Sequence, residues 1–559
     1  IKSYATPRRL AVLVSNLQIR QEDKTVQRKG PAVSAAFDAN GEPTKAALGF
    51  AQSCKTTIDQ VDRLKTDKGE WLYFEMTQPG QDVDKLLPQI VSQSLEKLPI
   101  PKRMRWGDKE NEFVRPVHWL VMLLGKQVIE ANILGIDASN TTHGHRFHSP
   151  DPVTIREPTD YASLLEEECH VIVDFEQRRT RIKEQVEAKG SVLGGTAIIN
   201  EDLLDEVTAL VEWPVAVSGD FEERFLDVPQ EALISSMQDH QRYFPVMDNR
   251  DKLMPHFITV ANIVSKKPSS IKAGNERVIR PRLADAAFFF EQDKKHSLDN
   301  HLEALKGVVF QNKLGTIHEK IERFTTLAQV IAEHFEIDTK DVERAGYLCK
   351  CDLMTTMVGE FPELQGTMGR HYATHDGEKA DVCVAIEEHY RPRFAGDELP
   401  TNPLGSALSI ADKLDTIAGI FAIGLLPTGD KDPYGLRRAA LGVLRILMEQ
   451  KLDIDLNELI SAAVNQIKLD INHDEVTNQI RQFIFERLRN YYADKSVSSD
   501  LFDAVYSCSP GKLTDFDQRI QACSEFMELP EAESLSAANK RVRNILKKVE
   551  GDLPSQVDP

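Results

Sequence analysis

Helical periodicity starts near residue 300 and continues, almost unbroken, through the rest of the chain. Apolar residues recur at steps of three and four over residues 318–334 and 342–358. This spacing puts them on one face of an α-helix, whereas a half-buried strand needs strict alternation of apolar and polar residues. Such segments are buried by packing helix against helix. The sequence therefore predicts three consecutive helical regions, over residues 301–426, 427–475 and 476–559.

The first 300 residues combine both periodicities. Strand-like runs at residues 10–14 and 71–76 alternate with helical runs at 83–98 and 115–124, and a long helix is predicted over 161–189. At 559 residues the chain also exceeds the size that one hydrophobic core fills. We expect a multidomain α+β protein whose N-terminal half is mixed α/β and whose remainder is helical. The mixed half divides into residues 1–150 and residues 151–300.

The balance of charge limits the classes of partner. A formal net charge of −19 argues against a protein that coats DNA or RNA nonspecifically, because phosphate backbones would be repelled. Three windows are locally positive, at residues 102–105, 266–282 and 534–548. We interpret them as contacts for one selected RNA, and the alternative is an ordinary solvated surface. The candidate RNA-binding residues are Arg103, Arg105, Lys266, Lys267, Arg280, Arg282, Arg487, Arg489, Lys540 and Arg541.

Two of these candidates lie in an aromatic part of the C-terminal region. Arg487 and Arg489 are close in sequence to Phe485, Tyr491 and Tyr492 on a predicted helix. Unpaired RNA bases stack on aromatic rings and on guanidinium planes, so this set is suited to single-stranded bases. The alternative is a tyrosine pair in the core, flanked by arginines whose apolar stems cover it.

Cysteine usage and hydropathy concern the compartment. Seven cysteines are scattered without a disulfide-like rhythm, which favours a reducing cytoplasm. No run approaches the roughly 20 apolar residues of a membrane-spanning helix, so no membrane association is expected. The chain starts at Ile1 rather than Met and shows no signal-like segment, which indicates a processed or partial chain.

Three histidines in six residues, His143, His145 and His148, raise the question of a metal site. Imidazole is a common zinc ligand, and His143 and His145 would point to one face of a strand. Against this, no cysteine lies nearby, and the next carboxylate, Asp151, follows Pro150. The alternative is a turn and strand whose imidazole rings are hydrogen-bonded to the protein.

A second constellation lies in the helical part. His318, Cys351, Asp352 and Asp412 occur in an order that resembles the HD superfamily of metal-dependent phosphohydrolases, with a His, a His-Asp pair and a final Asp. In that chemistry imidazole and carboxylate hold a divalent metal that activates water. Here Cys351 replaces the histidine of the pair, and a thiolate among harder donors spoils such a centre. We predict an HD-like fold over residues 301–426 that retains a degenerate remnant without metal; the alternative is an HD-type phosphohydrolase acting on nucleotides.

Two smaller groups of potential ligands have simpler explanations. Cys349 and Cys351 form a C-x-C pair, but no second pair completes a zinc site. His371, His375 and His389 are interpreted as exposed loop residues and helix caps.

Three rare strings establish a family resemblance. They are ATPRRL at residues 5–10, VGEFPELQGTMGRHY at residues 358–372 and DPYGLRR at residues 432–438. In this order, and over nearly the whole chain, they resemble the β subunit of bacterial heterotetrameric glycyl-tRNA synthetase. The resemblance includes Gly-His-Arg-Phe at residues 144–147 and implies no metal there.

The resemblance implies a division of labour between two kinds of subunit. An α subunit would activate glycine with ATP and Mg, while this chain would bind tRNA(Gly) within an α2β2 ligase, without cofactor or catalytic residue of its own. The chain indeed contains neither a Gly-x-x-x-x-Gly-Lys phosphate loop nor the signature strings of either synthetase class. The family also implies that residues 476–559 are the beginning of a longer, here truncated, helical anticodon-binding domain.

Overall fold

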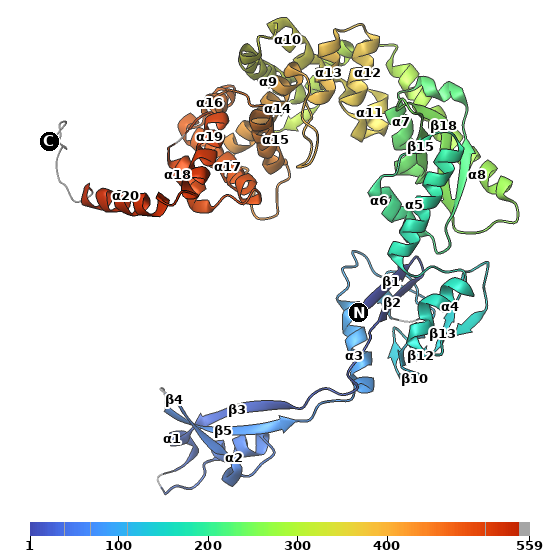
Figure 1. Ribbon diagram of the computed structural model, residues 1–559, viewed down its shortest axis with the longest axis vertical. Helices are drawn as coiled ribbons and strands as arrows, with labels where there is room; N and C mark the ends of the chain where they lie inside the picture. Colours follow the sequence, from blue (N-terminus) through green and yellow to red (C-terminus); the bar gives the residue numbers. More distant parts are fainter. Residues whose placement is uncertain (39, 67–68, 109, 509, 547–559) are drawn as a thin grey trace. The chain divides into compact units, whose positions relative to one another are not determined.

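The structure, a computed structural model, describes residues 1–546 except 39, 67, 68, 109 and 509. The described chain is a mixture of helices and small sheets, as predicted (Figure 1). It forms two compact units. The first unit contains residues 1–219, 242–251 and 256–275, and the second contains residues 220–241, 252–255 and those from 276 onward. The five domains derived from the sequence, and the boundaries between them, stay predictions.

The first unit contains a three-stranded antiparallel sheet in the order β3-β5-β4. Leu72 of β5 packs with Ala36 and Ala47 of two short helices, so the run at 71–76 is a central strand with one buried face. These elements are β3 (Lys24–Ala32), α1 (Val33–Ala36), α2 (Lys45–Ser53), β4 (Asp62–Thr66) and β5 (Gly69–Gln78).

The segment after this sheet corrects one prediction. α3 (Val83–Glu96) is present as expected, but residues 115–124 contain the strands β8 (Leu120–Val121) and β9 (Leu123–Leu124) instead of a helix. Gly125, at φ +56°, lies in the turn that pairs β9 with β10. A short apolar run does not reveal its period, so strand pairing decided the outcome. The other strands here are β6 (Met104–Arg105), β7 (Glu112–Phe113), β10 (Gln127–Val128), β11 (Asn132–Ile133), β12 (Ile136–Ser139), β13 (Thr141–His143) and β14 (Pro152–Thr154).

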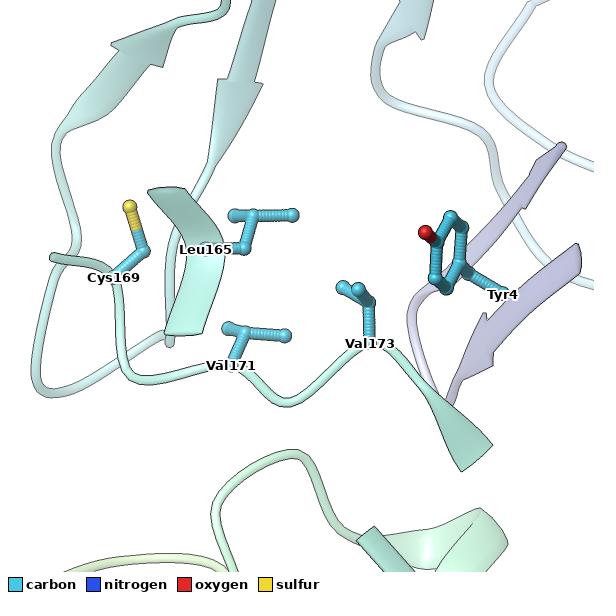
Figure 2. Close-up of a cluster of buried hydrophobic side chains, with 5 residues drawn as sticks. All are labelled: Tyr4, Leu165, Cys169, Val171 and Val173. Atoms are coloured by element: carbon cyan, nitrogen blue, oxygen red, sulfur yellow. The ribbon is translucent and has the colours of Figure 1, made fainter. Parts of the chain in front are cut away.

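A hairpin of β1 (Lys2–Thr6) and β2 (Arg9–Leu13) packs on the segment between two helices, α4 (Tyr161–Glu167) and α5 (Phe175–Val192). The helix predicted over 161–189 is therefore interrupted, because the intervening residues form a buried extended strip. Figure 2 shows Tyr4 of β1 and the side chains of this strip in one cluster. The buried members are Tyr4, Leu165, Cys169, Val171 and Val173.

A four-stranded sheet in the order β15-β17-β18-β16 follows. Phe257 and Ile258 of β18 are fully buried. A Cβ on Gly219 of β16 would lie 2.3 Å from the Phe257 ring, so this position requires glycine. The elements are β15 (Thr196–Ala197), α6 (Glu201–Leu210), β16 (Val215–Asp220), α7 (Gln230–Ser235), β17 (Phe244–Met247), β18 (Leu253–Ala261) and α8 (Pro268–Asp293).

The rest of the second unit is almost entirely helical, as the periodicity predicts. The run at 342–358 is not one helix, however, because it is divided between α10 (Thr339–Leu348) and α11 (Thr356–Glu360) by a short 3-10 turn at Cys351–Met354. α14 (Pro403–Ala422) is buried along most of its length and packs against α9, α13, α15 and α16. None of the helices in the described ranges is long and apolar enough to cross a membrane. The other helices are α9 (Ile317–Ala332), α10 (Thr339–Leu348), α11 (Thr356–Glu360), α12 (Thr367–His375), α13 (Ala380–Glu388), α15 (Leu436–Glu449), α16 (Leu456–Asn465), α17 (His473–Asp494), α18 (Ser499–Ser507), α19 (Leu513–Met527) and α20 (Ala532–Leu546), with two short strands, β19 (Val309–Gln311) and β20 (Gly315–Thr316), before α9.

Candidate functional site

Asp352, one residue of the HD-like remnant, is fully buried and holds the loop of the 358–372 string. Its carboxylate accepts hydrogen bonds from the backbone N–H groups of Gly366 and Gly369, at 2.5 and 3.1 Å. A Cβ on Gly369 would lie 2.7 Å from the Ile386 side chain and 3.1 Å from this carboxylate, which explains the glycine. Burial raises the pKa of Asp352 to about 6, although the two N–H donors and the Lys350 ammonium act in the opposite direction. Asp352 therefore supports the loop.

Asp412, the last residue of the remnant, is held between two lysines. Lys320 Nζ lies 2.6 Å from Asp412 Oδ1, and Lys350 Nζ lies 2.8 Å from Oδ2. All three side chains are largely buried: Lys320 is 5% exposed, Lys350 is 7% exposed and Asp412 is 13% exposed. Burial alone would raise the pKa of Asp412, but the two ammonium groups outweigh it and hold this pKa well below its usual range. A positive charge thus already lies at each oxygen to which a metal ion would bind.

The other two residues of the remnant do not join this carboxylate. Cys351 is buried and its thiol donates to the Tyr347 carbonyl at 3.2 Å. Burial raises the pKa of Cys351 to about 12, so it is a protonated thiol at neutral pH rather than a thiolate ligand. His318 lies near the start of α9, 3.7 Å from Glu322. Within the part of the chain that the structure describes, no group of three His, Cys, Asp or Glu side chains could hold a metal ion.

His389 corrects the interpretation of the nearby histidines as exposed. It is fully buried at the end of α13, with Nδ1 2.7 Å from the Ile386 carbonyl oxygen. Burial lowers the pKa of His389 well below its usual range, so the ring is neutral. The signal was present in the sequence, because His389 follows Cys383 and Ile386 at helical spacing on the buried face.

Lys413, next to Asp412, gives this site a pH dependence. Its ammonium group donates to the Arg391 carbonyl at 2.9 Å and to the Ser409 hydroxyl at 2.7 Å, and burial lowers the pKa of Lys413 from 10.5 to about 7. Between these two values the unfolded chain holds a proton that the folded chain has released. Stability should therefore rise with pH over this window, by up to about 1.4 kcal/mol per pH unit, without such a gain below pH 7.

The Lys413→Met variant should lack this slope. Hydrogen exchange of the α14 amides in both proteins between pH 6.5 and 9.5 measures it. The difference between the two proteins cancels the intrinsic pH dependence of exchange and the other titrating groups. An equal slope in both proteins would contradict the assignment to Lys413.

Arg9, from the first of the three strings, joins a distant part of the same unit through a buried ion pair. Its guanidinium group donates to the Glu212 carboxylate. It also donates to the His143 carbonyl at 2.6 Å and to the Gly144 carbonyl at 3.0 Å. The Thr6 hydroxyl donates to the same carboxylate at 2.8 Å. The Arg9 and Glu212 side chains are 3% and 2% exposed. This pair therefore fixes the turn that begins at residue 143.

The three-histidine segment is hydrogen-bonded, in agreement with the second interpretation. His145 Nε2 lies 2.7 Å from the Asn262 carbonyl oxygen, and its Nδ1 accepts from the N–H groups of Phe147 and His148, at 3.3 Å each. His148 Nε2 accepts from the Val264 N–H at 3.0 Å. Both ring nitrogens of His145 and one of His148 are thus engaged with the backbone.

The predicted RNA-binding residues of the first unit are exposed. Arg103 and Arg105 lie at β6, where Arg103 donates to a backbone carbonyl at 2.6 Å and Arg105 lies 3.7 Å from the Glu112 carboxylate. Lys266 and Lys267 lie between β18 and α8, and neither has a side-chain ion pair with another described residue. Their assignment to RNA stays a prediction.

The candidates of the second unit fall into separate groups. Arg280 and Arg282 are exposed on α8, and Arg280 Nε lies 2.7 Å from the Glu222 carboxylate. Lys540 and Arg541 are exposed on α20, whose described residues are nearly all open to solvent. The last residues of the basic window, at 547 and 548, lie outside the described residues.

Two of the three aromatic residues near Arg487 and Arg489 belong to the core. Phe485 and Tyr492 are buried, and the Tyr492 hydroxyl donates to the Asp517 carboxylate at 2.7 Å. These two rings are therefore unavailable for stacking on bases, whereas Tyr491 is half-buried, so the alternative of a tyrosine pair in the core holds for one tyrosine only. Arg487 and Arg489 are both half-buried. Their contact with RNA stays a prediction.

Sequence reasoning missed one exposed pair in the first unit, Arg146 and Phe147. Phe147 is 70% exposed although it belongs to the Gly-His-Arg-Phe string. The signal is an arginine beside an aromatic residue in a turn, and it lies within the three-histidine segment, where only the histidines were interpreted.

The chain was compared with known proteins. A family described as "Glycyl-tRNA synthetase beta subunit" matches residues 1–507. Relatives named glycine–tRNA ligase beta subunit are 53% identical in Hahella chejuensis, over 99% of this chain and 80% of the relative, and 53% identical in Stutzerimonas stutzeri, over 100% and 81%. A third, from Psychromonas ingrahamii, is 50% identical over 100% of this chain and 81% of the relative.

These matches place the chain among the subunits of aminoacyl-tRNA synthetases. It belongs to the glycyl-tRNA synthetase β-subunit family, as the three strings predicted.

Proposed function

We propose that this chain is the tRNA-binding subunit of a glycine–tRNA ligase. An α subunit supplies the site that joins glycine to ATP, with Mg, and the present chain binds tRNA(Gly) and presents it to that site. Two copies of each subunit form the working α2β2 enzyme in the cytoplasm. The family match over residues 1–507 carries this proposal.

The described side chains support a role in binding rather than in bond-making. The carboxylate of Asp412 is neutralised by Lys320 and Lys350, and the Cys351 thiol is buried and protonated, so neither is available to a reacting group. The exposed cations, in contrast, are suited to phosphates, and their confinement to a few windows of an acidic chain favours one selected RNA over DNA. The proposed tRNA contacts are Arg103, Arg105, Lys266, Lys267, Arg280, Arg282, Arg487, Arg489, Lys540 and Arg541.

Charge reversal on α20 tests the division of labour. Lys540→Glu/Arg541→Glu should weaken tRNA(Gly) binding by the α–β complex by about tenfold or more and reduce the slope of log K against log salt by roughly 0.9 per lost phosphate contact. Glycine-dependent ATP–pyrophosphate exchange by the complex should stay unchanged, because activation needs no tRNA contact. Filter binding over a salt series and the exchange assay measure the two quantities.

The matched control is Lys306→Glu/Lys313→Glu, two exposed lysines outside the proposed contacts. Equal loss of tRNA binding and exchange in the α20 variant would contradict its assignment. Exchange catalysed by the purified chain alone would contradict the proposed function itself.

A further inference from the structure

Phe147 is a large apolar side chain that the fold holds out in solvent. It is 70% exposed, whereas its neighbour His145 is buried. The Arg146 guanidinium lies 5.8 Å from the Phe147 ring centroid, so the ring and the cation present themselves together. An isolated exposed apolar residue is ordinary. Phe147 is unusual in two respects: a tightly hydrogen-bonded turn holds its backbone, and cations lie near its ring.

The support beneath Phe147 is rigid. Its backbone N–H donates to His145 Nδ1 at 3.3 Å, and the other nitrogen of that ring is fixed on the Asn262 carbonyl at 2.7 Å. A Cβ on Gly144 would lie 2.7 Å from Ser149, so the turn is tight enough to require glycine at that position. The Arg9 guanidinium holds the carbonyl of Gly144 at 3.0 Å. The ring therefore loses little freedom when a ligand stacks on it, which favours binding.

The charge around Phe147 is positive. Arg8, 38% exposed at its side chain, lies over the Trp119 ring at 5.5 Å, and Trp119 contacts His143 just before the turn. Lys266 and Lys267 are exposed two and three residues after Val264, whose N–H is bound by His148.

The acids in this region offset only part of that charge. Glu212 is already paired with Arg9, and the nearest exposed acid in sequence is Asp151. Arg146 thus contacts the exposed ring, and Arg8 is linked to the turn through Trp119 and His143. Lys266 and Lys267 follow closely in sequence the residue that His148 binds.

We propose that the Arg146-Phe147 turn stacks on an unpaired base of the bound tRNA while Arg8, Arg146, Lys266 and Lys267 hold the adjoining phosphates. An aromatic face flanked by cations is the combination that single-stranded RNA binds, because every base has a face to stack and every nucleotide a negative phosphate. A protein partner would use a ring of this kind within a broader apolar patch. Here the ring contacts the Arg146 cation, and Val264 is the exposed large apolar side chain that the His148 contact brings near the turn. The inference rests on the proposed function, since it requires that the chain binds tRNA.

Phe147→Ala in the α–β complex is the test. It should raise the Kd for tRNA(Gly) about tenfold, because stacking is lost, while the salt slope stays unchanged. Phe147→Trp should bind like the original protein.

Arg146→Gln should reduce the salt slope by roughly 0.7 to 0.9, because it removes a phosphate contact. 2-Aminopurine placed at the unpaired positions of the tRNA locates the stacked base, since its fluorescence should be quenched by Phe147 and recover in Phe147→Ala.

The chain offers a matched control, Phe394→Ala. Phe394 is 58% exposed and also follows an arginine, but Arg393 is paired with Asp397 at 3.0 Å. This variant should bind tRNA normally. A Phe147→Ala complex with unchanged tRNA affinity would overturn the inference and leave the proposed function intact, whereas absence of tRNA binding by the original complex would overturn both. Weaker association of Phe147→Ala with the α subunit without tRNA would show that this face binds protein and would also overturn the inference.

Discussion

Asp412→Ala is expected to destabilise the helical unit by about 3 to 5 kcal/mol. The substitution leaves Lys320 and Lys350 as buried ammonium groups without their shared carboxylate. Lys320 retains Asp415 at 3.1 Å, so Lys350 bears most of the loss. Because a chain of several units does not unfold in one step, hydrogen exchange of α9 and α14 is the appropriate measurement. Their amides should exchange about a hundredfold faster or more.

The triple variant Asp412→Leu/Lys320→Met/Lys350→Met is the control. It removes the charges together with their partner, so most of the lost protection should return. Asp415 keeps Arg323 at 2.7 Å and is not stranded. Two outcomes would contradict the role of the two lysines. One is that added divalent metal restores the hydrogen-exchange protection of Asp412→Ala, and the other is that Asp412→Ala exchanges at the same rates as the original protein.

Arg9→Met is expected to have an effect of similar size, about 3 to 5 kcal/mol, in the first unit. It leaves the Glu212 carboxylate buried, with Arg8 4.0 Å away as the remaining cation. It also frees the carbonyls of His143 and Gly144, so the turn that presents Phe147 should loosen. Hydrogen exchange of residues 143–149 measures the local opening, and the affinity for tRNA(Gly) should fall with it.

Two comparisons make that result specific. Arg9→Met/Glu212→Gln should recover part of the stability, because no buried charge is left alone. Arg8→Met alters an exposed side chain and should cost less than about 1 kcal/mol. A double variant no more stable than Arg9→Met would mean that the carbonyl contacts of Arg9, rather than its ion pair, dominate.

The sequence predicted the helical part of the fold better than the mixed part. The run at 318–334 is long enough to show its period, and it forms α9. The run at 115–124 is short and its residues 120–124 are all apolar, so it shows no period and its strands were decided by partners elsewhere in the chain. The break between α4 and α5 arises because residues 169–173 fill the space beneath β1, which no local pattern records.

The candidate site shows the same division. The order His318, Asp352, Asp412 can be read from the sequence, but the lysines at Asp412 do not belong to any metal-ligand pattern and come from other segments of the chain. One signal existed: Lys320 lies one turn before Phe324 on the apolar face of α9, where a solvated lysine would not be expected. Lys350 carried no comparable signal, since it lies between helices and its role follows from the tertiary fold.

The link between Thr6 and Glu212 sets the order in which the newly made chain can mature. The two residues are 206 positions apart, and a ribosome adding about 5 to 20 residues per second needs about 10 to 40 s to cover that distance. A two-stranded hairpin alone is at best marginally stable in water. During this interval β1 and β2 have no Glu212 to pair with, so these two strands leave the exit tunnel long before they can settle, and they are where a nascent-chain chaperone would bind.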